Sequence, residues 1–552
     1  MNTLATAECY PITVVSGLSP LYLDFCAGAP AVRDFYGRTF GEAWRSERPR
    51  RPEHWPRLVS ILGEQNPGAS AARQLEALRG GAGTVLTGQQ VSFFGGPLFT
   101  PFKAATALAR ARQATAAGDE HVGIFWLASE DHDFAEVQSV TFPARREVRT
   151  LKYEKAPTAA VPVGGIVLDE SVNALLDQAG QLVGYSDALE ALTEAYKPGR
   201  TFAQAFADFY RKVFAAQGLL MFDAAGRDVH ALGAPVLLAA IEGADEMHAA
   251  LTARGRALEA AGYHEQVAVA PNSSLLFLLD ARTGARVALK RVAASAAEPN
   301  GLWQAGREKI STEELTGILA AEPERISPSA LLRPVFQDYL FATSLTIGGP
   351  AEVAYFAQSA VLFELILTRM TPLHPRFTAT IVEPDIAELL RRHELSLERV
   401  FEETIHPTNK DPSVGTPAPD SMAQLLAARS MPAEGKRRLA AAGTALDTEL
   451  TEVVGWMNRL NADLGRSGET AASKMRYQMN RLRRLGANFV LQREESLKRH
   501  AQAICAAVFP GGKQQERVHG AAWYFARHGF EFAEELVEHA AKDCPGHSAL
   551  WV

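Results

Sequence analysis

The sequence predicts an α/β protein with a parallel sheet, followed by a long antiparallel helical arm. Residues 84–137 show a strand, loop, helix, strand, loop pattern, which is typical of a βαβ unit. Polar residues follow both predicted strands directly, and ligands bind at such strand ends in open α/β sheets. Apolar residues with heptad spacing between positions 439 and 464 indicate a coiled coil.

The βαβ unit begins with the short apolar run Val85-Leu86, which leads into a loop rich in glycine and glutamine. An alanine-rich stretch over residues 103–113 predicts the helix, and the apolar run 122–128 predicts the second strand. Glycines in the loops allow close approach of the backbone to a ligand. The chain has neither a G-x-G-x-x-G fingerprint nor a Walker lysine pattern at this point.

The second predicted strand ends at Glu130-Asp131-His132-Asp133, which places three carboxylates around one imidazole. Such a cluster can bind a cationic amine, hold a metal or tune a general base. A solvated polar turn is the alternative interpretation.

A second motif covers residues 327–355 and predicts a helix start, a strand, and a Gly-Gly-Pro turn that opens a helix carrying Glu352 and Tyr355. Arg333 is a fixed positive charge that could bind a carboxylate or phosphate with two hydrogen bonds. It could equally bridge backbone carbonyl groups.

The heptad pattern predicts two long helices over residues 385–505, with a hairpin turn at residues 465–468. Because an arm of this length cannot bury its apolar seam fully within itself, we expect a homodimer through the arm.

Bulk properties narrow the class of protein. The chain has 552 residues and a net charge of −7, which predicts more than one structural unit and argues against nucleic acid as a partner. The sequence contains no apolar run of about 18 residues and no secretory signal, so we expect no membrane partner. The four scattered cysteines predict neither a disulfide framework nor a metal site; we expect inert thiols in a reducing cytoplasm. They are Cys9, Cys26, Cys505 and Cys544.

Three stretches together resemble a known family. They are Thr87-Gly88-Gln89-Gln90, then Gly96-Pro97-Leu98-Phe99-Thr100 with Lys103, and Trp126-Leu127-Ala128-Ser129-Glu130-Asp131-His132-Asp133-Phe134. In order and spacing they resemble the motifs of the cysteine-adding enzymes of bacillithiol biosynthesis, the BshC family. The chain departs from the family at Ser92 and Phe99, where glycine and tyrosine are usual. The resemblance covers nearly the whole chain and is strongest at 84–137 and 327–356.

The resemblance implies a Rossmann-like core with inserted connecting segments, plus the antiparallel α-helical coiled-coil domain. We expect the core at residues 1–384, with insertions at about 140–190 and 230–325, the arm at 385–505, and a C-terminal segment at 506–552 that docks on the core. The implied activity is an amide-forming ligase that adds L-cysteine to the amine of glucosaminyl malate, in the last step of bacillithiol biosynthesis. The cofactor is unknown, and a nucleotide, ATP or ADP, is a candidate.

On this basis we expect His132 to be a general base, Asp131 to orient it, and Glu130 and Asp133 to complete the catalytic set. No metal ligand is assigned. The expected substrate-binding residues are Thr87, Gly88, Gln89, Gln90, Gly96, Lys103, Arg333, Gly349, Glu352 and Tyr355. We expect the glutamine loop, Lys103, the acidic cluster and Arg333 to converge in one pocket.

Two other functions are compatible with parts of the sequence. A nucleotidyltransferase or class I aminoacyl-tRNA-synthetase-like enzyme would share such a core, but the chain has no HIGH or KMSKS motif. A non-catalytic coiled-coil scaffold would not need polar residues at several strand ends.

Overall fold

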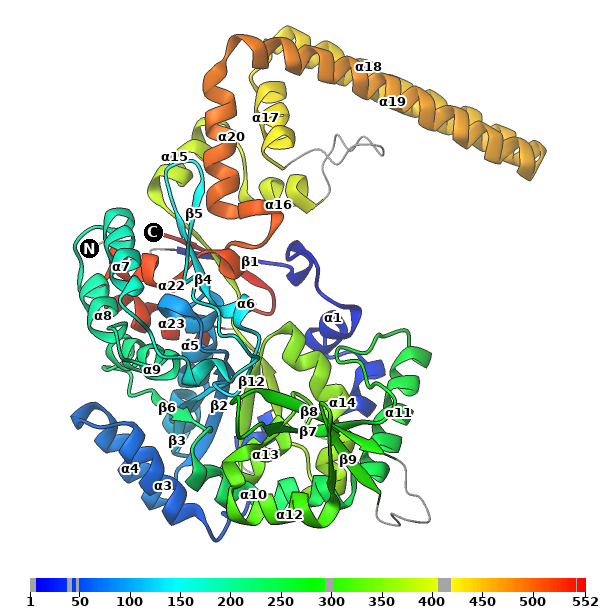
Figure 1. Cartoon of the computed structure of the whole chain (residues 1–552). Coiled ribbons are helices and arrows are strands. Elements are labelled where there is room, and N and C mark those ends of the chain that lie inside the picture. Colours follow the sequence, from blue (N-terminus) through cyan, green and yellow to red (C-terminus); the bar gives the residue numbers. More distant parts are fainter. Residues whose placement is uncertain (1–5, 37–41, 46–48, 293–300, 406–417, 543) are drawn as a thin grey trace. The chain divides into compact units, whose positions relative to one another are not determined.

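The computed structural model describes residues 6–36, 42–45, 49–292, 301–405, 418–542 and 544–552 (Figure 1). The chain separates into two compact units. The first consists of Met1–Phe142, Arg149–Ala379 and Glu516–Ser548. The second consists of Pro143–Val148, Thr380–Gln515 and Ala549–Val552.

The first unit is organised around a five-stranded parallel sheet with the order β13-β12-β2-β3-β6. Its strands are β2 (Gly83–Gln89), β3 (His121–Leu127), β6 (Leu220–Asp223), β12 (Leu345–Gly348) and β13 (Leu373–Pro375). The predicted βαβ unit is confirmed as β2, α5 (Phe99–Ala116) and β3. From β2 the chain adds β3 and β6 on one side and later adds β12 and β13 on the other. The strand order therefore reverses between β2 and β12, where open α/β sheets bind ligands.

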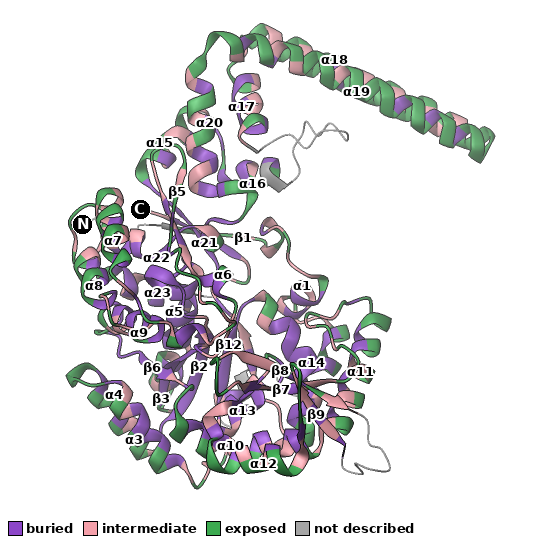
Figure 2. Ribbon diagram, viewed as in Figure 1, coloured by how far each residue is buried: buried purple, intermediate pink, exposed green. Residues whose placement is uncertain are grey.

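Helices cover both faces of this sheet, because successive strand residues point to opposite sides. Leu86 and Trp126 belong to one buried cluster with Leu62 of α3 (Trp55–Gln65) and residues of α4 (Ala69–Gly80). Val85 instead packs with Ala107 of α5 in a second cluster. The central strands β2 and β3 are buried along almost their whole length (Figure 2). The α/β, Rossmann-like fold class is confirmed.

The inserted segments contain a second, antiparallel sheet with the order β10-β9-β8-β7-β11. Its strands are β7 (Ser273–Leu279), β8 (Arg286–Val292), β9 (Leu302–Ala305), β10 (Glu308–Ser311) and β11 (Ile326–Pro328). The accompanying helices are α10 (Arg227–Glu242), α11 (Ala244–Ala260) and α12 (Thr312–Ala321). An earlier segment supplies β4 (Ser139–Pro143), β5 (Val148–Lys152), α7 (Ser171–Val183), α8 (Asp187–Ala195) and α9 (Phe202–Val213).

The remaining elements flank these sheets in the sequence. The helices are α1 (Pro20–Cys26), α2 (Arg33–Tyr36), α6 (Phe134–Val137), α13 (Arg333–Phe341), α14 (Pro350–Ile366), α21 (Gln515–Val518), α22 (Ala521–His528) and α23 (Glu531–Ala541). The strands are β1 (Thr6–Tyr10), β14 (Ala379–Val382) and β15 (His547–Trp551). Within the described ranges, no helix combines the length and apolar character that a membrane span needs.

The second unit is mainly helical, as predicted for residues 385–505. Its helices are α15 (Pro384–Arg392), α16 (Leu397–Ile405), α17 (Ala418–Arg429), α18 (Ala433–Leu460), α19 (Ala462–Arg493) and α20 (Glu495–Val508). Helices α18 and α19 run side by side as a long hairpin, here called the arm (Figure 1).

The predicted position of the hairpin turn is wrong. The turn lies at Asn461, whose side chain accepts hydrogen bonds from the backbone N–H groups of Asp463 (2.7 Å) and Leu464 (3.2 Å) and so caps α19. Gly465 and Gly468 lie inside α19 and are buried. A Cβ atom on Gly465 would lie 1.6 Å from Oδ1 of Asn458 in α18. These glycines therefore allow close packing of the two helices, which their spacing in the sequence does not distinguish from a turn.

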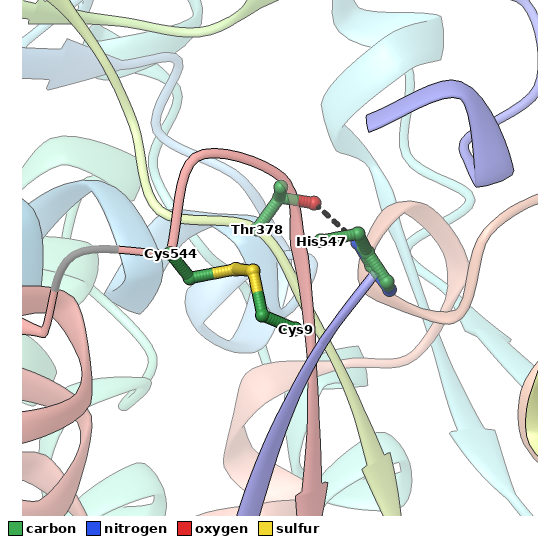
Figure 3. The surroundings of a disulfide bond; sticks show 4 residues. All are labelled: Cys9, Thr378, Cys544 and His547. Carbon is green, nitrogen blue, oxygen red and sulfur yellow. Dashed lines mark hydrogen bonds between the residues drawn. A yellow bond between two sulfur atoms is a disulfide. The ribbon is translucent and has the colours of Figure 1, made fainter. Parts of the chain in front are cut away.

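The cysteine prediction is also wrong in part. Cys9 of β1 and Cys544, just before β15, form a disulfide although 535 positions separate them (Figure 3). Cys26 and Cys505 are free thiols. Nothing in the local sequence around either half-cystine indicates a partner so far along the chain.

Candidate functional site

The switch point between β2 and β12 carries the first group of predicted site residues. The Thr87 hydroxyl donates to the carbonyl of Ile347 (3.2 Å) and links the two strands near their carboxyl ends. Gly88 follows in β2, where a Cβ atom would lie 2.9 Å from the carbonyl oxygen of Trp126. The glycine is therefore required by the close approach of β3.

Lys103 joins the two loops at this switch point. Its buried ammonium group donates to the carbonyl of Gly88 and to Oε1 of Gln89, both at 2.8 Å, and lies 2.5 Å from Oε2 of Glu352. An ammonium group has three protons, and these three acceptors use all of them. Burial lowers the pKa of Lys103, although the Glu352 carboxylate opposes that shift. Lys103 therefore holds the loops together. It has no spare proton for a substrate anion, although the family resemblance implies a substrate-binding role.

Glu352 and Gly349 form the start of α14. The backbone N–H of Gly349 donates to Oε2 of Glu352 (2.7 Å) in a capping arrangement. The same carboxylate therefore satisfies the helix start and Lys103. Because Glu352 occupies this N-terminus, the backbone amide of Gly349 is not open to a substrate anion in this state.

The acidic loop after β3 is tied to the glutamine loop after β2. Nε2 of Gln90 donates to Oδ2 of Asp131 (2.6 Å), and Oδ1 of Asp131 accepts from the backbone N–H of His132 (2.7 Å). The Asp131 carboxylate thus shapes the turn. The predicted hydrogen bond that would orient His132 is not formed, since Oδ1 lies 3.9 Å from Nδ1 of the ring.

Arg286, the first residue of β8, takes the orienting position instead. Its Nη1 lies 3.3 Å from Nδ1 of His132, and its guanidinium group stacks over Phe277, 3.8 Å from the ring centroid. Nη2 donates to the carbonyl of Pro328 (2.8 Å), and Nε donates to Ser327 (2.9 Å). Since a guanidinium group only donates, a neutral His132 ring in this contact carries its proton on Nε2.

Glu130 points the other way, into the interior. Its Oε1 lies 2.8 Å from Nε2 of His230 in α10, and Nδ1 of His230 bonds to the carbonyl of Ile326 (2.9 Å). A carbonyl only accepts, so Nδ1 carries a proton, and one more proton is shared between Nε2 and Glu130. Burial alone would lower the pKa of His230, but the Glu130 carboxylate outweighs burial and the pKa is raised. Burial likewise opposes ionisation of Glu130, yet His230 lowers its pKa. The pair is a buried ion pair.

Asp133 does not join these groups. It is exposed and caps α6, where Oδ1 accepts from the backbone N–H of Glu136 (3.3 Å). Its neighbour on the other side of the loop, Ser129, donates to Asp223 at the end of β6. Burial raises the pKa of Asp223.

Arg333 opens α13 and donates to the phenol oxygen of Tyr355 and, at 3.5 Å, to Oε1 of Gln337. After the larger effect of burial, its positive charge contributes to the shifted pKa values of Lys103 and Glu130. Arg333 therefore shares the electrostatic environment of both loops. Burial raises the pKa of Tyr355, which stays a neutral donor and acceptor.

The two positions that depart from the family pattern lie near Gly96 and Lys103. Gly96 has φ 69°, and a Cβ atom there would lie 2.7 Å from Cβ of Ser92, so the loop is tight at this point. The Phe99 ring lies under two cations: Nζ of Lys103 is 5.9 Å and Cζ of Arg376 is 5.4 Å from its centroid. A tyrosine at this position would keep both contacts and add a hydroxyl.

The structure thus links the glutamine loop, Lys103, Glu130, Asp131, His132 and Arg333 into one region at the strand ends, and leaves Asp133 outside it. Two participants were missed from the sequence: His230 and Arg286. His230 lies in an ordinary-looking helix, and Arg286 begins an inserted strand, so neither shows a local signal. No group of three or more His, Cys, Asp or Glu side chains suited to a metal ion occurs among the residues that the structure describes.

Comparison with known proteins identifies the family. Residues 7–377 match the model for "Bacillithiol biosynthesis BshC, N-terminal Rossmann-like domain". A protein of Koribacter versatilis named "Putative cysteine ligase BshC" is 37% identical over 99% of both chains. A protein of the same name from Solibacter usitatus is 30% identical over 91% of this chain and 90% of its own. The one from Salinibacter ruber is 28% identical over 98% of both. The chain belongs to the BshC family of bacillithiol biosynthesis.

Proposed function

We propose that the chain is an amide-forming ligase that joins the carboxyl group of L-cysteine to the amine of glucosaminyl malate, as the last step of bacillithiol biosynthesis. Family membership and the name of its relatives support the ligase class. The observation that carries the proposal is the pairing of Gln90 with Asp131, because it ties the His132 loop after β3 to the glutamine loop after β2, which Lys103 also binds through Gln89. Charged and amide groups of this kind act by positioning reactants and by stabilising charge.

We propose that His132 accepts the proton of the attacking amine. Arg286 fixes the ring through Nδ1 in the present state, so the ring must exchange that contact for the substrate before it can accept a proton. Loss of a general base lowers kcat by about 10² or more.

Two variants test this role. His132→Gln retains a hydrogen-bond donor but cannot take up a proton, whereas His132→Ala removes both functions. Equal losses of about 10² in kcat are expected. Substantial activity in His132→Gln alone would show that the ring acts as a hydrogen-bond donor and not as a base.

The acidic residues of the loop after β3 suit the amine partner, and the guanidinium group of Arg333 suits the malate carboxylates. We propose that Asp131 attracts the substrate ammonium group and that Arg333 binds the malate. In the present state the guanidinium group of Arg333 is held by a neutral phenol and an amide, and neither contact neutralises its charge.

Amide formation from a carboxylate and an amine needs a source of free energy, and we propose that a nucleotide supplies it. Omission of ATP from purified enzyme, cysteine and glucosaminyl malate should abolish formation of the thiol product. Cysteine-dependent exchange of pyrophosphate into ATP would show that activation proceeds by adenylation. Product formation at the full rate without nucleotide would remove the nucleotide from the proposal.

We further propose that the core to residue 384 carries the chemistry and that the arm within 385–505 forms a homodimer in the cytoplasm. Large apolar side chains remain exposed on the arm, with Trp456 and Leu460 52% and 58% exposed. Others are Leu464, Met475, Leu482, Leu485 and Phe489. The interior of the hairpin contains small residues such as Gly443 and Ala472, so the large residues face outward and need a cover.

Light scattering at micromolar concentration tests the assembly. The full chain should have twice the monomer mass, and deletion of residues 433–500 should give a monomer. A monomeric full chain would contradict the assembly without affecting the ligase proposal.

A further inference from the structure

A cavity of about 520 Å³ lies in the first unit. Its walls come from α1, the middle of α5, β13, the end of α23 and the segment just before β15. The volume is within the range that holds small molecules. Cys544 is part of the lining, whereas its disulfide partner Cys9 is not among the described residues that line the cavity.

The lining of this cavity is cationic. Arg110 and Lys542 contribute positive charges to it, Arg376 contributes a third that is paired with the buried Glu516 carboxylate, and no carboxylate side chain lines the cavity within the described part of the chain. Trp44 and Phe377 provide apolar walls. A concave surface with charge of one sign concentrates ligands of the opposite sign.

We propose that this cavity admits a small anionic thiol, which exchanges with the Cys9–Cys544 disulfide by attack on Cys544. Cys544 is half-buried and lines the cavity, whereas Cys9 is exposed, so the cations beside Cys544, and not its accessibility, direct an anionic thiol to this half-cystine. A cysteine ligase acting on a malate-bearing amine releases such a thiol, so the product itself is the physiological reactant. That last identification rests on the proposed function, but the exchange site does not. Disulfides in reducing compartments are commonly transient and redox-sensing.

The exchange is balanced with two thiols. The first thiolate donates an electron pair to Sγ of Cys544, the bond between Cys544 and Cys9 breaks, and Cys9 leaves as a thiolate that takes up a proton. The second thiolate attacks the sulfur of the bound small thiol and releases Cys544 as a thiolate. Two small thiols are oxidised to one small disulfide, and the protein disulfide is reduced to two thiols.

The free thiol in the same cavity does not compete in this exchange. Cys26 lines the cavity, but burial raises its pKa to about 11. Because the thiolate is the nucleophile, Cys26 remains an unreactive thiol near neutral pH. It provides a matched control for any experiment on Cys544.

Hydrogen bonds link the segment that follows Cys544 to Arg376, which lies near the candidate site. Three residues after Cys544, Nδ1 of His547 bonds to the Thr378 hydroxyl (2.9 Å), as Figure 3 shows beside the disulfide. Thr378 donates to Oε2 of Glu516 (2.9 Å), which also accepts from Nη1 of Arg376 (3.0 Å).

The far end of this chain touches the switch point. A Cβ atom added to Gly349 would lie 3.4 Å from Nε of Arg376, so the guanidinium group is close to this residue. Release of the segment at Cys544 therefore loosens the support of Arg376, and the redox state of the disulfide is coupled to the start of α14.

Exchange rates on the full-length oxidised protein test the site. Mercaptosuccinate, mercaptoethanol and cysteamine are compared at equal thiolate concentration, and released Cys9 is quantified by alkylation and mass spectrometry. Mercaptosuccinate is expected to react at least ten times faster than mercaptoethanol, with cysteamine slowest and the mixed disulfide on Cys544. Lys542→Gln should reduce this preference several-fold, whereas Lys542→Arg and Cys26→Ser should keep it.

Equal rates per thiolate for the three reagents, or an adduct on Cys9 or Cys26, would overturn the proposal. Neither measurement involves ligase turnover, so an inactive ligase leaves this result intact. Hydrogen exchange tests the coupling: reduction should accelerate exchange in residues 544–548. Unchanged exchange there would overturn the link to Arg376.

Discussion

His230 and Glu130 form a buried ion pair in which Nε2 of the imidazole lies 2.8 Å from the carboxylate. Nδ1 of the same ring is bound to the carbonyl of Ile326, so the pair keeps its shared proton only while both partners stay in place. The acidic loop after β3 is thereby anchored to helix α10 of the inserted region.

This pair predicts a pH dependence of stability. The pKa of His230 is raised in the folded protein, so its stabilisation is complete below about pH 6.5 and is lost as the pH rises through the folded value. The pKa of Glu130 is lowered, so its contribution is lost only on acidification. His230→Gln should lower the free energy of unfolding by about 3–5 kcal/mol at pH 6. It should also reduce the fall of that free energy at alkaline pH. Urea unfolding at several pH values measures both, and an unchanged alkaline slope would contradict the ion pair.

His547 predicts a loss of stability at acid pH, opposite to the alkaline loss predicted for His230. Burial lowers its pKa to about 4, so the neutral ring stabilises the fold fully above about pH 6.5, and this contribution is lost as the pH falls toward 4. The difference amounts to about 3 kcal/mol. His547→Gln can still bond to Thr378 but cannot be protonated, so its unfolding free energy should fall less steeply with acidification. Parallel acid slopes for the two proteins would refute this assignment.

Arg333 predicts a kinetic signature. Arg333→Ala should raise the KM for glucosaminyl malate about tenfold or more with a smaller change in kcat, because it removes a binding charge and no proton acceptor. Tyr355→Phe leaves the charge and removes only the phenol contact, so its effect should be smaller. Steady-state rates with varied glucosaminyl malate decide the matter, and an effect confined to kcat would exclude Arg333 as the malate site.

The arm predicts different outcomes at two glycines. Gly465→Ala should destabilise the hairpin by about 1–3 kcal/mol, since its methyl group would meet Asn458 of the facing helix. The nearest atom to a Cβ on Gly455 is Nη1 of Arg459 at 3.7 Å, so Gly455→Ala should stabilise α18 by up to about 1 kcal/mol. Hydrogen exchange of α18 and α19 peptides in the full chain distinguishes them, and equal effects would rule out close packing at Gly465.

Local sequence patterns were sufficient for part of this structure. The βαβ unit at Gly83–Leu127 and the approach of Gln90 to the 130–132 loop follow from strand periodicity, because adjacent parallel strands bring their carboxyl ends together. The helical arm follows from its heptads. Catalytic and substrate-binding roles for these residues remain predictions.

Contacts between distant residues could not be read in this way. Arg286 meets His132 across 154 positions, and the Cys9–Cys544 bond spans 535. The family resemblance places Lys103 among the substrate-binding residues. Only the folded structure shows that three protein acceptors use its protons.

The first unit is built from segments that lie far apart in the chain, so it cannot be completed until late in synthesis. Arg376 is buried against Glu516, which the ribosome adds 140 positions later. At roughly 5–20 residues per second, the guanidinium group waits roughly 7–28 s for its carboxylate, while the intervening residues of the second unit emerge. The helices of the second unit thus have time to fold before the Arg376–Glu516 pair can form. The nascent core needs protection from aggregation during that interval, which makes late translation its vulnerable phase.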